Sequence, residues 1–202
     1  MTGKRVTNSW AHPDENSSVY ELKAYVENVF ARLGLHMHDL VVGNLTDDIY
    51  AAGLSVQTRG GKRLATFGIV TKKLLKAFDI DNEVYYADFN WKELLKAIRN
   101  VKVSYTEISK FPAVKRDLAL LLDKKVQFAE IEKIAYETEK KLLKEVSLFD
   151  VYEGKNLEAG KKSYAVSFLL QDENATLNDK QIDKIMSKLV KNLEDKLNAK
   201  LR

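Results

Sequence analysis

An apolar stripe near the end of the chain places the strongest constraint on its fold. The stripe recurs at the spacing of helical turns and consists of Ile182, Ile185, Met186, Leu189, Leu193 and Leu197. Asn178 stands before it with Gln181 three residues later, a pattern typical of a helix N-terminal cap. A helix that is apolar along one side buries that side against another element. The sequence therefore predicts a helix that lies on a sheet.

The segments around this helix predict the strands of that sheet. Strand patterns occur at residues 116–123, 143–152, 163–171 and 199–202. Phe128, Ile131 and Ile134 mark a second helix between the first two of these strands. The order β-α-β-β-α-β is that of the ferredoxin-like fold, in which both helices cover one face of the sheet. Small residues alternate with large ones and indicate the uncovered face; they are Ala119, Ser163, Ala165 and Ser167.

Residues 1–99 predict a separate layered structure of helices and antiparallel strands. The predicted helices span 18–33, 71–78 and 91–99, and the predicted strands span 40–42, 54–58, 63–70 and 83–89. Gly34 suits the end of the first helix, and Gly60-Gly61 suits the tight turn of a hairpin. Because the strands and helices follow no strict βαβ repeat, the fold class is predicted to be α+β.

A polar, extended stretch over residues 100–114 separates the two patterns, and Pro112 stops any helix there. The chain is long enough for two medium-sized domains. We therefore predict one domain over residues 1–108 and another over residues 109–202.

Composition limits the classes of function. The 202 residues include no cysteine, which excludes disulfides, thiolate zinc sites and a cysteine nucleophile. The sequence has neither an apolar run of about 18 residues nor a signal-peptide pattern, so a cytoplasmic protein without membrane contact is expected. The net charge is +4, and residues 109–202 carry 19 Lys and Arg against 16 Asp and Glu. This excess favours a polyanionic partner only mildly.

Motifs of catalysis and metal binding are missing from the sequence. It contains no Gly-rich phosphate loop and no G-x-S-x-G nucleophile motif. His36 and His38 lack a third ligand at metal spacing, so we interpret them as loop or surface residues. Asp47-Asp48 and the carboxylates of Asp79–Asp81 lie in turn-like segments. We predict no catalytic residue, no metal site and no cofactor in this chain.

Basic residues near aromatic residues give the most informative functional signal. They cluster where the first strand of the second domain begins and around the connection between its middle strands. If these segments lie close together, they form one cationic region with aromatic faces for unstacked bases. The candidate RNA-binding residues are Lys115, Arg116, Tyr152, Lys155, Lys161 and Lys162. Charge alone is equally compatible with Lys-rich loops that only keep the surface soluble.

Ordered motifs in the second half resemble a known family. The segment S-K-F-P-A-V-K-R-D-L-A at residues 109–119 and the segment L-F-D-V-Y-E-G-K at residues 148–155 are the two longest matches. Shorter matches follow at 160–163 and 171–177. They resemble the ferredoxin-fold anticodon-binding domain at the C-terminal end of bacterial phenylalanyl-tRNA synthetase beta subunits. The resemblance implies binding of the anticodon region of tRNA-Phe.

The first half is similar to part of the same subunit's catalytic-like module, a class II synthetase fold with an antiparallel sheet. Gly3-Lys4-Arg5, Tyr20 to Lys23 and Arg63 to Gly68 carry this similarity. Ala51-Ala52-Gly53 and Thr71-Lys72 stand where relatives often have H-P-G and H-P.

The resemblance implies that this module is inert. It also implies that an alpha subunit performs aminoacylation with ATP and magnesium, within a heterotetramer of alpha and beta subunits. The expected role of the chain is therefore to bind tRNA and to contact the alpha subunit.

Two other functions remain open from the sequence. Ferredoxin-like domains also bind amino acids as regulatory modules. A class II ligase fragment with activity of its own is the third possibility, although the missing nucleotide loop argues against it.

Overall fold

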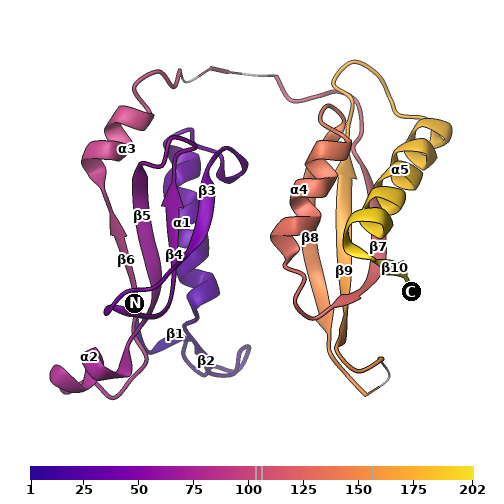
Figure 1. Cartoon of the computed structure of the whole chain (residues 1–202). Helices are drawn as coiled ribbons and strands as arrows, with labels where there is room; N and C mark the ends of the chain where they lie inside the picture. The colour runs from indigo at the N-terminus through magenta and orange to yellow at the C-terminus, as the bar shows by residue number, and fades with distance from the viewer. Residues whose placement is uncertain (103, 106, 156) are drawn as a thin grey trace. The chain divides into compact units, whose positions relative to one another are not determined.

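The computed structural model describes residues 1–102, 104–105, 107–155 and 157–202 (Figure 1). The chain divides into two compact units, residues 1–105 and residues 106–202, which we call the first and second unit. The polar stretch predicted over residues 100–114 includes residues 103 and 106, which lie outside the described residues. Each unit has its own buried hydrophobic cluster.

The first unit is built on an antiparallel sheet with the strand order β3-β4-β5-β6. Its strands are β3 (Val41–Leu45), β4 (Tyr50–Gln57), β5 (Arg63–Val70) and β6 (Tyr85–Phe89). Its helices are α1 (Val19–Arg32), the 3-10 turn η1 (Met37–Asp39), α2 (Lys72–Ala77) and α3 (Trp91–Ala97). A short hairpin of β1 (Lys4–Val6) and β2 (Glu15–Asn16) precedes them and was not predicted.

Helix α1 supplies much of the core of the first unit. Ser18 caps its start by accepting a hydrogen bond from the backbone N–H of Glu21. Leu22, Val26 and Phe30 are buried against the central strands, among them Phe67 of β5. The hairpin between β4 and β5 turns at Gly60-Gly61, where Gly61 has a φ of 78°, as the turn prediction required.

The second unit has the predicted ferredoxin-like topology. Its elements are β7 (Val114–Asp123), α4 (Phe128–Thr138), β8 (Leu143–Tyr152), β9 (Lys161–Leu170), α5 (Asp179–Leu197) and β10 (Lys200–Leu201). The strand order β10-β7-β9-β8 is antiparallel throughout. Helices α4 and α5 lie side by side on the same face of this sheet (Figure 1). The prediction of an α+β fold is confirmed.

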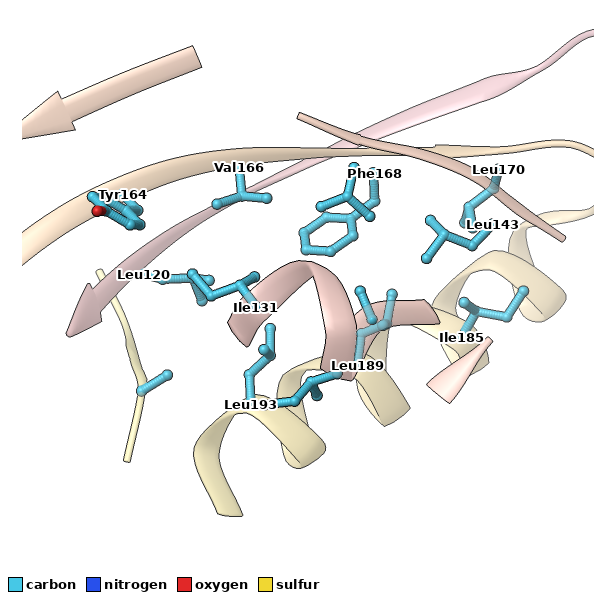
Figure 2. Close-up of a cluster of buried hydrophobic side chains, with 14 of the residues drawn as sticks. Leu120, Ile131, Leu143, Tyr164, Val166, Phe168, Leu170, Ile185, Leu189 and Leu193 are labelled. Carbon is cyan, nitrogen blue, oxygen red and sulfur yellow. The ribbon is translucent and has the colours of Figure 1, made fainter. Parts of the chain in front are cut away.

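The core of the second unit lies between these helices and the sheet (Figure 2). Leu189 and Leu193 of α5 and Ile131 of α4 are fully buried against Val166 and Phe168 of β9. The Asn178 and Gln181 side chains form the capping box that the sequence predicted for α5.

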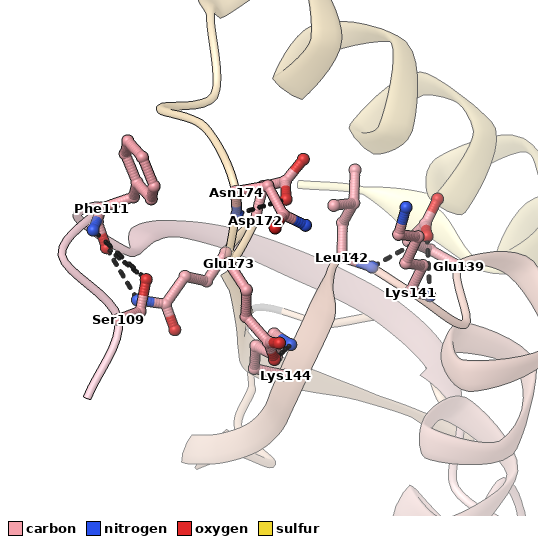
Figure 3. Close-up of polar contacts among 10 residues, drawn as sticks. Ser109, Phe111, Glu139, Lys141, Leu142, Lys144, Asp172, Glu173 and Asn174 are labelled. Atoms are coloured by element: carbon pink, nitrogen blue, oxygen red, sulfur yellow. Dashed lines mark hydrogen bonds and ion pairs between the residues drawn. The ribbon is translucent and has the colours of Figure 1, made fainter. Parts of the chain in front are cut away.

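Contacts within the motif residues hold the start of β7 in place (Figure 3). Ser109 accepts a hydrogen bond from the backbone N–H of Phe111 at 3.2 Å. The Gln171 amide donates to the carbonyl of Phe111 at 2.8 Å, and the backbone N–H of Gln171 donates to Leu142. The segments 109–119 and 171–177 therefore meet in the fold.

Candidate nucleic-acid interface

The sheet of the second unit has one face that α4 and α5 do not cover. Alternation along β7 and β9 directs the core residues, such as Leu120 and Val166, toward the helices. The residues between them face the other side. Ala119 pairs with Ala165 in the middle of this open face. As predicted, small residues form its floor.

Two aromatic rings on β8 stand beside this floor, each with a cation over it. Phe149 is 57% exposed, and the Lys115 ammonium lies 5.7 Å from the centre of its ring. The Arg202 guanidinium lies 5.4 Å from the centre of the Tyr152 ring. The cations belong to β7 and to the residue after β10, so their side chains extend over the intervening strands. Such pairs of a cation and an aromatic face are attractive and also suit stacking by bases.

Gly154 sets the position of the Tyr152 ring. A Cβ atom on Gly154 would lie 2.2 Å from the Tyr152 hydroxyl oxygen and 2.3 Å from Cζ, so the ring packs directly on the glycine backbone. Any larger residue at position 154 forces the ring to move. This contact gives a physical reason for the glycine in the segment at residues 148–155.

The structure does not bring the predicted basic residues into one region. Lys115 and Arg116 lie at the start of β7, whereas Lys161 pairs with Asp123 at the end of the same strand. Eight residues of strand separate the two ends, which corresponds to roughly 26 Å. The prediction of one cationic region is therefore wrong, because the two connections lie at opposite ends of the sheet.

Arg116 points to the side of the sheet that the helices cover. It shares that side with Leu118 and Leu120, and its guanidinium lies 3.9 Å from the Asp179 carboxylate at the start of α5. Arg116 is nevertheless exposed.

Lys161 forms an ion pair with Asp123 at 2.9 Å on the open face. The hydrogen bond and positive charge of Lys161 lower the pKa of the Asp123 carboxyl. Lys155 is exposed in the segment after β8, and among the described residues it makes no side-chain hydrogen bond or ion pair.

Lys162 is only 6% exposed and lies within the fold. Its ammonium donates to the Tyr164 hydroxyl at 2.7 Å and sits 4.3 Å from the centre of the same ring. The sequence placed it with the surface lysines because charge alone does not show which side of a strand a residue occupies.

Two residues of the open face were missed in the sequence. Phe149 belongs to the segment at 148–155, and its neighbours Leu148 and Val151 are also apolar, so the sequence did not mark it as an exposed residue. A bulge between Leu148 and Asp150 shifts the pairing of β8 at this point. Arg202 gave no local signal, because only the strand order brings it near Tyr152.

The first unit does not provide a metal site in the part of the chain that the structure describes. The His36 and His38 rings stack with 5.4 Å between their centres. Among the described residues, no group of three or more His, Cys, Asp or Glu side chains could hold a metal ion. Asp47 accepts hydrogen bonds from the backbone N–H groups of Ile49 and Tyr50, which confirms its interpretation as a turn residue. None of the described helices is long and apolar enough to cross a membrane.

Comparison with known proteins matches both units to the same subunit. Residues 109–202 match the ferredoxin-fold anticodon binding domain, and residues 1–91 match the phenylalanyl tRNA synthetase beta chain CLM domain. The chain is 86% identical over all its 202 residues to the phenylalanine–tRNA ligase beta subunits of Bacteroides thetaiotaomicron and Bacteroides fragilis. It is 54% identical over 202 residues to that of Porphyromonas gingivalis. In each case the match covers all of this chain and 25% of the relative.

Proposed function

Because this chain belongs to the family of phenylalanyl-tRNA synthetase beta subunits, we propose that its second unit binds the anticodon region of tRNA-Phe on the open face of the sheet. The observation that carries the proposal is the pair of cation-covered rings, Phe149 with Lys115 and Tyr152 with Arg202. Unstacked loop bases stack on aromatic faces, while cations beside them meet the phosphates of the same strand.

The floor of the open face supports this arrangement. Ala119 and Ala165 carry no side chain large enough to keep a base away from the sheet. The Asp117 carboxylate in the same face accepts a hydrogen bond from the Ser167 hydroxyl. A flat surface between two aromatic rings therefore remains available to a single-stranded loop.

The basic residues outside this centre take secondary roles in the proposal. Lys155 and Lys161 lie at the Tyr152 end of the sheet, where they would meet phosphates that flank the stacked bases. Arg116 lies at the Lys115 end but on the side that the helices cover, so it is left out of the proposed contacts of the open face. Lys162 is left out of the proposed contacts because its ammonium is buried against Tyr164.

The family also suggests what the rest of the assembly contributes. We propose that an alpha subunit carries out aminoacylation with ATP and magnesium, that the first unit packs against this subunit, and that the chain itself has no catalytic centre. The chain spans a quarter of the length of the relatives named above. We propose that it acts in the cytoplasm.

Binding of the anticodon stem-loop of tRNA-Phe to the full chain, measured by fluorescence anisotropy over a salt series, tests the open face. Phe149→Leu and Tyr152→Leu should each weaken binding by about 1–3 kcal/mol, the usual contribution of one stacked base. Lys115→Gln should reduce the salt slope by about 0.7, the value for one phosphate contact in a single strand.

Matched controls lie in the first unit. Tyr20 is an exposed tyrosine on α1, and Lys92 is an exposed lysine on α3. Tyr20→Leu and Lys92→Gln should leave both the affinity and the salt slope unchanged. The proposal fails if both leucine variants of β8 bind the RNA as tightly as the unaltered chain does.

A further inference from the structure

The helical side of the second unit carries lysines that the proposed binding on the open face does not use. They belong to α5 and to the turn between α4 and β8, and all are exposed; we call Lys140, Lys141, Lys180, Lys184 and Lys188 the lysine cluster. Lys188 joins its two parts, because its ammonium donates to the carbonyl of Thr138 at the end of α4 at 3.0 Å. Since α4 and α5 cover the opposite side of the sheet, the cluster faces away from the open face (Figure 1).

The lysine cluster has no ion-pair partner within the part of the chain that the structure describes. The acidic residue of the turn, Glu139, turns its Oε1 atom to the backbone: it accepts hydrogen bonds from the N–H groups of Lys141 and Leu142, both at 3.0 Å (Figure 3). The positive charge of the cluster is therefore available to a partner outside the chain.

The acidic residues of the two helices are engaged or lie elsewhere. Glu137 of α4 forms an ion pair with Lys196 at 3.1 Å. Asp183 and Glu194 lie on the other flank of α5, in a hollow that also includes Leu201 of β10. The surface of α5 is thus divided into a flank with carboxylates and a flank with the lysine cluster.

The spacing of the α5 lysines is unfavourable for the isolated chain. Lys180, Lys184 and Lys188 follow one another at intervals of four residues, so they are neighbours on the helix surface over roughly 12 Å of its length. Like charges at this spacing repel each other and destabilise a helix. A bound polyanion would remove the repulsion, which salt alone only screens.

The surroundings of the lysine cluster indicate the kind of polyanion. A protein interface has an apolar centre, membrane binding requires an apolar face, and single-stranded RNA is held by aromatic rings. Among the described residues, none of the exposed large hydrophobic side chains lies on α4, on α5 or in the turn after α4. The phosphates of an RNA double helix need only cations, because its bases are already paired and stacked.

We propose that the lysine cluster binds the phosphate backbone of an RNA double helix. The α5 lysines meet phosphates along one strand, and Lys140 and Lys141 meet phosphates beside them. This contact is additional to the binding of an anticodon loop on the open face and does not depend on it, because a double helix has no unstacked base to place between Phe149 and Tyr152.

Titration of the full chain with a short blunt-ended RNA duplex without unpaired bases tests the proposal. Fluorescence anisotropy should give a dissociation constant between about 10⁻⁴ and 10⁻⁶ M at physiological salt, the usual range for binding through phosphates alone. In ¹⁵N–¹H NMR spectra of the same titration, the amide shifts should be confined to α5 and residues 138–144. Shifts confined to β7, β8 and β9 would place the duplex on the open face and overturn the proposal.

A double substitution locates the site. Lys180→Gln combined with Lys184→Gln should weaken duplex binding about fivefold or more and lower the salt slope by about 1.4–1.8, because each phosphate contact contributes about 0.7–0.9. The midpoint of thermal unfolding should not fall, since the change removes a repulsion and breaks no contact. Lys72→Gln combined with Lys76→Gln is the matched control: it removes the same charge at the same spacing from exposed positions of α2 and should bind as the unaltered chain does.

Three further outcomes would overturn the proposal. Equal losses in the two double variants would mean that only the net charge of the chain matters. Tighter binding of poly-L-glutamate than of the duplex would assign the lysine cluster to an acidic protein. The absence of saturable binding would show that the lysines only form a solvated surface. None of these outcomes affects the proposed binding of the anticodon loop, because the duplex contains no unstacked base.

Discussion

Gly154 shows how one residue without a side chain positions a functional ring. The Tyr152 ring occupies the space where a Cβ atom of residue 154 would stand, and Arg202 lies over the same ring. An attraction between a cation and an aromatic ring requires the charge to lie within about 6 Å of the ring centre. The glycine therefore acts on the proposed RNA contact through the tyrosine.

We predict that Gly154→Ala weakens binding of the anticodon stem-loop several-fold and leaves the free energy of unfolding within about 0.5 kcal/mol of the original value. The Cβ atom meets the far end of a surface ring, which can rotate away, so the fold tolerates it while the stacking position is lost. Anisotropy titration and urea unfolding measure the two quantities.

Gly60→Ala is the control for this prediction, because Gly60 lies in the first unit with an ordinary φ and no close neighbour at its Cβ position. Equal affinity of Gly154→Ala and the unaltered chain would show that the position of the Tyr152 ring does not matter for RNA binding.

At the scale of elements, α4 and α5 are joined by a buried polar contact. The Thr138 hydroxyl at the end of α4 donates to the Ile134 carbonyl and accepts from the Asn192 amide of α5, both at 2.7 Å. Lys188 of α5 donates to the Thr138 carbonyl at 3.0 Å. The bond from Lys188 pairs the carbonyl of Thr138, in the last turn of α4, where carbonyl groups have no partner within the helix.

Asn192→Ala should lower the free energy of unfolding of the second unit by about 1 kcal/mol, the usual net contribution of one hydrogen bond. Lys191→Ala changes the neighbouring exposed position of the same helix and should have a much smaller effect. Urea unfolding followed by circular dichroism compares the two variants. If both lose the same stability, the contact between the helices contributes nothing beyond helix propensity.

The sequence predicts elements best where a local period carries the signal. Helix α5 and its cap follow from the spacing of apolar residues, and the strands of the second unit follow from alternation. The β1–β2 hairpin has only a few exposed residues and no such period, so it was missed.

The candidate site was harder to predict because it depends on register. The pairing of β7 with β9 puts Lys161 beside Asp123, at the opposite end of β7 from Lys115. The burial of Lys162 and the approach of Arg202 to Tyr152 also depend on contacts between distant strands. Charge contains no information about these contacts, although the alternation along β9 already puts Lys162 in phase with the core residues Val166 and Phe168.

At the scale of the whole molecule, the two units have separate cores. Phe67 and Phe30 belong to the core of the first unit, and Leu189 and Phe168 belong to the core of the second. A domain with its own core and a boundary that few contacts cross folds on its own. The predicted boundary at residue 108 differs by three positions from the division between the compact units.

We predict that the two units unfold independently. Leu189 is fully buried, so Leu189→Ala should destabilise the second unit by about 2–5 kcal/mol and leave the first unit unchanged. Phe67→Ala should destabilise the first unit by about 3–5 kcal/mol and leave the second unchanged.

Both tryptophans, Trp10 and Trp91, lie in the first unit, so tryptophan fluorescence reports on that unit alone. Circular dichroism at the helical band reports on both units. In urea, Leu189→Ala should therefore shift part of the circular dichroism transition to a lower urea concentration and leave the fluorescence midpoint unchanged. Phe67→Ala should shift the fluorescence midpoint to a lower urea concentration. A fluorescence midpoint that moves with Leu189→Ala would mean that the units unfold as one cooperative body.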